Sequence, residues 1–247
     1  MSTAAKNWDD YVVHAEEVAR SAGFLAIRDR IFEIAAPQPS EVTADIGAGT
    51  GLLTLPFAAR SREVWAIDIS PAMTEYIRVK ALSAGLQNVQ PCTASAISLP
   101  LVDGSVDIVV SNYCFHHLDE AGKHRALAEV HRVLRPGGRL VFGDMMFRVS
   151  LIDSRDRRVM AQKVRGMLAK GPSGVWRLAR NGMRFATGRW ESPARAEWWY
   201  AALQQHGFES VKVDLLPHEG GIASARRSAG EITEPSTADV VLPSPVR

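Results

Sequence analysis

The sequence has few cysteines and no long apolar run. Among its 247 residues only Cys92 and Cys114 are cysteines, which is too few for a disulfide framework or a four-cysteine zinc site. Both lie in apolar stretches, so we expect buried free thiols in a reducing cytosol. No run of 18 apolar residues occurs, so we expect no membrane-spanning helix. The stretch MSTAAKNWDD lacks the basic and apolar regions of a secretory signal, and we expect a cytoplasmic protein.

Charge of one sign is also lacking, because 29 Lys and Arg stand against 27 Asp and Glu and give a net charge of +2. This balance indicates no particular partner. The hydrophobic content of 46% and the length suit one α/β domain with a sizeable core.

Apolar runs and helical patterns alternate along the chain. After an N-terminal helix that ends before Pro37, the pattern predicts strands at 42–46, 63–69, 89–93, 106–111 and 139–143, and helices at 52–60, 71–85 and 119–134. A helix at 195–207 and strands at 211–216 and 221–227 follow, the last at an edge of the sheet. This rhythm is typical of a Rossmann-like α/β fold. We expect an open, twisted, mostly parallel sheet of about seven strands with helices on both faces.

A basic segment interrupts the rhythm. Residues 148–189 contain eleven Arg and Lys but two acids. We expect one domain over 1–227, with a helical N-terminal region (1–40), a helical insert (145–194) and a disordered tail (228–247). The insert has three interpretations: a lid over an apolar acceptor site, a surface that contacts anionic lipid, or a nucleic-acid interface. The small net charge makes nucleic acid the least favoured.

The stretch VTADIGAGTGLLTLPFA predicts a strand, a glycine loop and a helix. A P-loop needs Gly-Lys-Ser/Thr, but Leu52 follows Gly51. The dinucleotide pattern G-x-G-x-x-G needs a third glycine at 52 or 54, which are Leu and Thr. A dinucleotide is therefore disfavoured, although it is not excluded.

Two acids narrow the choice of ligand. Asp45 ends the first strand, where its charge would repel a pyrophosphate and attract an ammonium or sulfonium. Asp68 ends the second strand about 20 residues past the loop, where a carboxylate accepts hydrogen bonds from ribose hydroxyls. The pattern favours a nucleoside with a cationic tail, and hence S-adenosylmethionine.

These residues resemble class I S-adenosylmethionine-dependent methyltransferases. Four motifs occur in the family's order over residues 41–144: DIGAGTG, AIDIS, SLPLVDGSVDIVVSNYCFHHL and EVHRVLRPGGRLVFGD. They are most similar to the ubiquinone/menaquinone methyltransferase-like branch of small-molecule enzymes. The resemblance implies a methyltransferase that acts on a small, apolar or aromatic acceptor.

The resemblance also implies which residues hold the cofactor. Asp45 would contact its amino group, Asp68 its ribose, and Gly47, Gly49 and Gly51 its methionine part. Adenine would pack on Ile69 and Met73, beside Ser95 and Ala96, and the Asn112 backbone would close the site. Ser95 departs from the aspartate that is common in the family, so this hydrogen bond to adenine would lack charge assistance.

Candidate catalytic residues follow the fourth and fifth strands. His116, His117 and Asp144 lie where parallel sheets bind ligands. An imidazole titrates near neutral pH and suits a general base, and Asp144 could hold the substrate or orient a histidine. No metal site is expected. Two alternatives stay open: a nucleic-acid methyltransferase that uses the basic insert, and a non-catalytic cofactor-binding regulator with the same fold.

Overall fold

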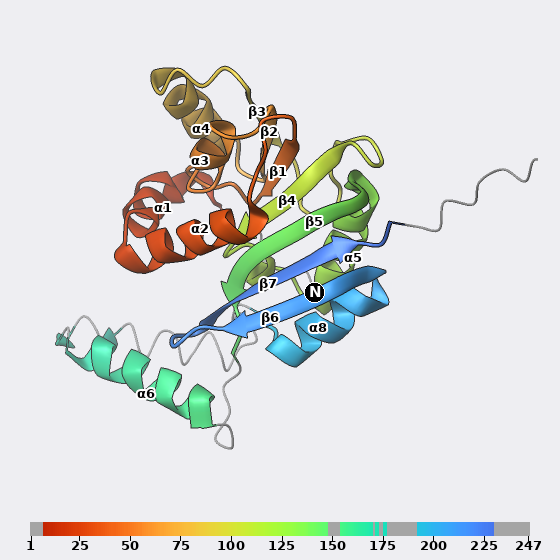
Figure 1. The fold of residues 1–247 in the computed structure, drawn as a ribbon. Coiled ribbons are helices and arrows are strands. Elements are labelled where there is room, and N and C mark those ends of the chain that lie inside the picture. Colours follow the sequence, from red (N-terminus) through yellow and green to blue (C-terminus); the bar gives the residue numbers. More distant parts are fainter. Residues whose placement is uncertain (1–6, 148–153, 170, 173–174, 177–191, 230–247) are drawn as a thin grey trace, which may run out of the picture.

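A seven-stranded sheet forms the centre of the protein (Figure 1). The structure is a computed structural model that describes residues 7–147, 154–169, 171–172, 175–176 and 192–229. The strand order is β3-β2-β1-β4-β5-β7-β6. The strands are β1 (Val42–Ile46), β2 (Glu63–Asp68), β3 (Val89–Thr93), β4 (Val106–Asn112), β5 (Leu134–Met145), β6 (Phe208–Leu215) and β7 (Gly220–Arg227).

Strands β1 to β5 are parallel, whereas β7 runs antiparallel to both β5 and β6. The prediction of a mostly parallel, Rossmann-like sheet is confirmed. The prediction that 221–227 forms an edge strand is wrong. It pairs with β5 on one side and with β6 on the other, and β6 forms the edge. Its sequence, GGIASARR, is buried over most of its length, as an interior strand requires.

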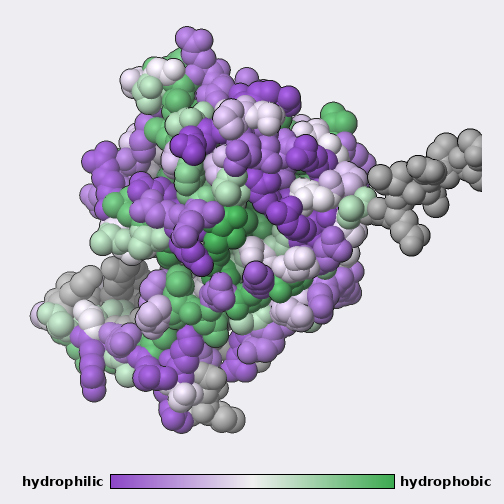
Figure 2. Space-filling view, in the orientation of Figure 1, coloured by the Kyte–Doolittle hydropathy of each residue, from purple (hydrophilic) through white to green (hydrophobic). Residues whose placement is uncertain are grey.

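Helices cover both faces of the sheet (Figure 1). On one face, α2 (Ala22–Ala35) and α3 (Thr54–Ala58) bury Ile27, Ile31 and Phe57 against β2, β4 and β5, and α4 (Pro71–Ser83) contacts β2 and β3. On the other face, α5 (Glu120–Val133) and α8 (Ala196–Gln205) bury Leu127 and Trp199. Figure 2 shows hydrophobic residues near the middle of the face in view, with hydrophilic residues around them.

Predicted helix starts agree well with the structure. Ser70 caps α4 by accepting a hydrogen bond from the Met73 N–H, and Pro71 occupies the first turn. Asp119 caps α5 in the same way through Gly122. The helix predicted at 52–60 is shorter, because α3 covers Thr54–Ala58 and residues 52–53 still belong to the turn that follows the glycine loop.

The boundary between α5 and β5 differs from the prediction. Pro136, Gly137 and Gly138 are typical of a helix end, and strand 5 was predicted to start at Arg139. Instead β5 begins at Leu134. The Pro-Gly-Gly stretch lies at a register shift, since Val106 pairs with Leu134 and Ile108 pairs with Arg139. The extra residues form an irregularity in the ladder rather than a loop.

Helix α6 (Ser154–Leu168) lies in the basic segment (Figure 1), and its Val159 is buried in a cluster with Met145 at the end of β5. Arg155 anchors it by donating to the carbonyls of Met146 and His218. The lid interpretation assigns Trp176, Met183, Phe185 and Trp190 to the lining of the acceptor site. Trp176 is 72% exposed, whereas the other three, and residues 230–247 of the predicted tail, lie outside the described residues. The lid and lipid interpretations stay predictions.

In the described part of the chain, no helix is long and apolar enough to cross a membrane. Both cysteines are free, but they are half-buried rather than buried as predicted.

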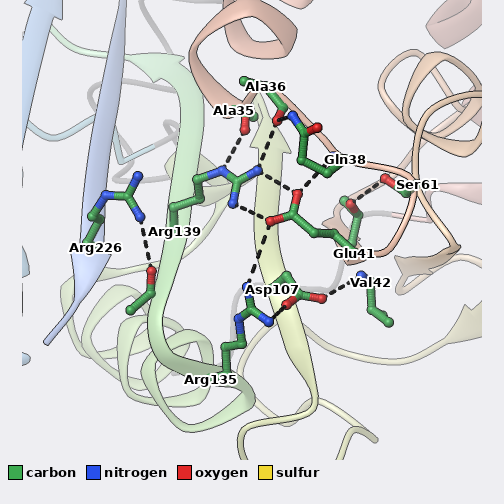
Figure 3. Close-up of polar contacts among 12 residues, drawn as sticks. Ala35, Ala36, Gln38, Glu41, Val42, Ser61, Asp107, Arg135, Arg139 and Arg226 are labelled. Carbon is green, nitrogen blue, oxygen red and sulfur yellow. Dashed lines mark hydrogen bonds and ion pairs between the residues drawn. The ribbon is translucent and has the colours of Figure 1, made fainter. Parts of the chain in front are cut away.

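A charged cluster joins α2, β1, β4 and β5 at the amino ends of the strands (Figure 3). Arg139 donates to both carboxylate oxygens of Glu41, at 2.8 and 2.7 Å, and to the carbonyl of Ala36. Arg135 contacts Asp107 at 2.5 Å, and the Asp107 carboxylate accepts the N–H of Val42. Hydrogen bonds from Arg139 hold the pKa of Glu41 below its usual range.

We expect Arg139→Met to lower the free energy of unfolding by about 3 kcal/mol, because it leaves the buried Glu41 carboxylate without its main partner. Urea titration at pH 7 measures the loss. The loss should shrink below about pH 4, because the low folded pKa of Glu41 stabilises the protein only while Glu41 is ionised. Arg226→Met is the matched control. Arg226 is exposed and donates to one carbonyl, that of Gly137, so an equal loss there would contradict the assignment.

Candidate active site

The predicted site residues lie along one edge of the sheet. Strands β1, β2, β4 and β5 are neighbours and parallel, so their carboxyl ends meet there. The ends carry Asp45, Asp68, Asn112 and Asp144. The glycine loop after β1 and the short helix η2 (Phe115–His117) after β4 lie at the same edge.

The glycine loop needs its glycines for conformation, and it needs Gly47 for space as well. Gly47, Gly49 and Gly51 have φ angles of 69°, 54° and 84°, which glycine adopts readily. A Cβ on Gly47 would lie 2.4 Å from the Sγ of Cys114. The loop backbone therefore packs directly against the segment that follows β4, and leaves no room for a side chain.

Asp45 is buried below this loop. Its carboxylate is 1% exposed and accepts the Thr54 hydroxyl at 2.6 Å. Burial raises the pKa of Asp45 to about 7, and the nearby charge of Asp68 adds to the effect. Asp45 is therefore poised to change charge near neutral pH.

Asp68 lies next to the loop at the end of β2. Its two carboxylate oxygens accept the N–H groups of Gly49 at 2.8 Å and Ser70 at 3.0 Å. It is half-buried, and burial raises its pKa. The carboxylate thus links the glycine loop to the start of α4.

The predicted adenine contacts occupy the side of the site near β3. Met73 is buried, whereas Ile69 is 59% exposed and available to a planar ligand. Ser95 and Ala96 follow β3 and are half-buried. The Ala94 N–H donates to the Asp68 carbonyl, which brings this loop to the end of β2.

Asn112 ends β4 beside Gly143. Its Oδ1 is buried and has no hydrogen-bond partner within the described residues. The next residue, Tyr113, has a φ of 54°, an uncommon angle for a non-glycine side chain. Strain of this kind gathers at functional sites.

His116 and Asp144 form a buried pair. Their Nδ1 and Oδ1 atoms are 2.6 Å apart, and the other carboxylate oxygen accepts the His116 N–H at 2.9 Å. The N–H of Met145 also donates to Oδ1. Asp144 is 0% exposed and His116 is 4% exposed. An acid that accepts three donors fixes both the backbone and the ring of the histidine.

His117 has a different environment. It is exposed, and its ring centroid lies 4.6 Å from that of Trp8 and 3.9 Å from that of His116. The aromatic contacts continue from His116 to Tyr113 and from Tyr113 to Phe24. The structure thus separates the two histidines, and only His116 is paired with Asp144.

Sequence reasoning missed the N-terminal segment of the site. Besides Trp8, Asp9 reaches the start of α4, where its carboxylate accepts the Ser70 hydroxyl and the Ala72 N–H. Helix α1 (Val12–Ala19) presents Glu16 to Lys80, whose Nζ also donates to the carbonyl of Thr50 in the glycine loop. The sequence around Asp9 and Glu16 does not indicate which distant residues these two acids contact.

Known proteins resemble this chain in sequence. A family model of the methyltransferase domain matches residues 44–138. An uncharacterized methyltransferase of Geobacillus kaustophilus is 31% identical over 167 residues, which cover 68% of this chain and 72% of that protein. The chain belongs to the methyltransferase family. Its cofactor is S-adenosylmethionine, as the glycine loop and the two acids predicted.

Solved structures support the fold of the methyltransferase. A SAM-dependent methyltransferase from Aquifex aeolicus has a TM-score of 0.61 and 18% identity, and the match covers 87% of this chain and 98% of that one. The [4+2]-cyclase SpnF also has a TM-score of 0.61, with 18% identity, and the match covers 86% of this chain and 84% of the cyclase. The likeness to solved structures therefore shows the class I fold, and it does not show which reaction the site catalyses.

The residues of the methyltransferase fit this cofactor. A loop with glycine at alternate positions offers close approach to its backbone, and Gly47 has no space for a Cβ. Asp45 and Asp68 offer carboxylates for an ammonium and for ribose hydroxyls. The buried Oδ1 of Asn112, which lacks a partner in the described structure, adds an acceptor at the same edge.

Proposed function

We propose that the protein transfers a methyl group to a small, apolar or aromatic acceptor, as in the ubiquinone/menaquinone methyltransferase-like branch, and that His116 is its general base. The pairing of His116 with Asp144 is the observation that carries this proposal. S-adenosylmethionine, when bound, supplies an electrophilic methyl group, which is attached to a positively charged sulfur.

Asp144 determines which nitrogen of His116 acts as the base. Because its carboxylate accepts the Nδ1 hydrogen, the lone pair lies on Nε2. That nitrogen would take a proton from a hydroxyl or amine of the acceptor. A base held in one tautomer and one orientation needs no reorganisation during the reaction.

Burial and ring contacts support a small acceptor. His116 is 4% exposed, so the reacting group must reach it inside the protein. The rings of His117 and Tyr113 pack on His116, and those of Trp8 and Phe24 extend these ring contacts outward. They would pack on an apolar or aromatic molecule. A polymer such as RNA would have to insert a single group this far.

The proposal is tested by measuring the release of S-adenosylhomocysteine with panels of phenols, quinols and amines, beside total RNA. We expect turnover with a member of the small-molecule panels. Turnover with RNA alone would favour the nucleic-acid alternative. Tight binding of S-adenosylhomocysteine without turnover on any substrate would favour a regulator.

We propose that Asp45 contacts the cofactor's ammonium group and expect this contact to make binding depend on pH. With a pKa of about 7, Asp45 must lose its proton before it can pair with the ammonium. The affinity for S-adenosylhomocysteine should therefore fall as pH decreases below 7, approaching about tenfold per pH unit. Calorimetry between pH 5.5 and 7 measures this slope. Adenosine, which lacks the ammonium, is the control ligand, and an equal slope for adenosine would contradict the assignment.

A further inference from the structure

A lysine lies buried beneath the candidate base. Lys123 in α5 is 2% exposed, on the helix face that also carries the buried Ala126, Leu127 and Val130. Lysine is rarely buried to this extent unless it is paired, because removing an ammonium from water is costly. This chain therefore keeps a charge where its helix otherwise buries apolar side chains.

The ammonium of Lys123 holds the end of the turn that carries the histidines. Its Nζ donates a hydrogen bond to the carbonyl of Leu118, the residue that follows η2. Asp144 binds the same turn from β5 through the backbone and ring of His116. Lys123 and Asp144 thus fix the turn from two sides, one at Leu118 and the other at His116.

The charge of Lys123 also acts on Asp144. Burial lowers the pKa of Lys123. The negative charges of Asp144, Asp119 and Glu120 oppose that lowering, and Asp144 has the largest effect of the three. Asp119 and Glu120 are exposed, whereas Asp144 is fully buried. A positive and a negative charge in the protein interior affect one another more strongly than the same charges in water.

We propose that Lys123 is a positioning residue for His116: it holds the turn that carries the histidine and balances the charge of Asp144, the partner of its ring. The inference rests on the proposed role of His116. A positive charge beside a carboxylate offsets the attraction of that carboxylate for a proton on a neighbouring imidazole. The other titratable groups of the described chain near this point are His117 on η2, Tyr113 and Cys114 after β4, and Glu219 before β7, which acts on Tyr113.

Three substitutions separate the charge of Lys123 from its hydrogen bond. Lys123→Met removes both, Lys123→Gln keeps a donor for the Leu118 carbonyl without the charge, and Lys123→Arg keeps the charge. The pKa of His116 is read by NMR of histidine-labelled protein, with the signal assigned from the His116→Gln variant. The acid limb of the kcat/KM profile is measured in parallel.

We expect Lys123→Met and Lys123→Gln each to raise the pKa of His116 by about one unit, the usual effect of losing one nearby charge. Lys123→Arg should restore the original value, which a purely structural role would not require. If Lys123→Met does not fold, Lys123→Gln carries the comparison. An unchanged His116 pKa in a folded neutral variant overturns the inference.

The two readouts distinguish this inference from the proposed function. If the pKa of His116 measured by NMR increases, and the pKa of the acid limb in the pH profile of kcat/KM increases with it, both the inference and the proposed function are supported. If the NMR pKa rises while the kinetic profile stays in place, Lys123 acts on His116 as inferred, but His116 is not the base. The second result would support the inference and contradict the proposed function.

Discussion

Asp68→Ala is expected to weaken the binding of S-adenosylhomocysteine by at least about 100-fold. The carboxylate would accept hydrogen bonds from two ribose hydroxyls, and a hydrogen bond to a charged group contributes about 1.5–3 kcal/mol. Asp68 also accepts the N–H groups of Gly49 and Ser70. Its removal therefore releases the glycine loop as well as the ribose. Calorimetric titration at pH 7.5 measures the change.

Two controls limit the interpretation of this experiment. Asp68→Asn keeps the shape and one acceptor oxygen, so its affinity should lie between those of wild type and Asp68→Ala. Asp214→Ala removes an exposed acid of β6, away from the site, and should bind like wild type. Wild-type affinity in a folded Asp68→Ala protein would mean that the ribose is held elsewhere.

The second large effect is expected at the buried pair. His116→Gln should lower kcat by about 10² to 10⁴-fold, the usual contribution of a general base, while the affinity for S-adenosylhomocysteine stays near that of wild type. Asp144→Asn should cause a loss of similar size, because an amide at this position would favour the wrong tautomer of His116. Turnover is followed with the best acceptor from the small-molecule panels.

The adjacent histidine provides the matched control. His117 lies on the same turn but is exposed and packs against Trp8, so His117→Gln should affect the KM for the acceptor more than kcat. The double variant of His116 and Asp144 should be no slower than the slower single variant, since the two residues act as one unit. Full activity of His116→Gln would exclude it as the base.

Local patterns predicted most elements because their signals are local. Strand β3 was predicted to the residue, and the helix predicted to begin at residue 71 does begin there, as α4. The position of β7 was missed because strand order depends on pairing between distant segments. No pattern within 221–227 specifies that β5 and β6 lie on its two sides.

The candidate site shows the same limit. Parallel strands bring their ends together, so Asp45, Asp68 and Asp144 could be placed at one edge from the sequence. The choice between His116 and His117 could not, because it depends on which ring turns toward β5. Lys123 did leave a signal: it precedes Ala126, Leu127 and Val130 by three, four and seven residues, the spacing of one helix face.

The antiparallel placement of β7 affects how the chain folds as it is synthesised. Strand β6 contacts the rest of the sheet through β7, yet β7 is made after it. Until residues 220–227 have left the ribosome, β6 has no sheet partner. The apolar face of α8, with Trp199, then lacks the part of its packing that β7 provides. The five parallel strands can assemble earlier, since each finds its neighbour among residues already made. A nascent chain that pauses before residue 220 would expose an unpaired strand edge, the kind of surface that chaperones protect.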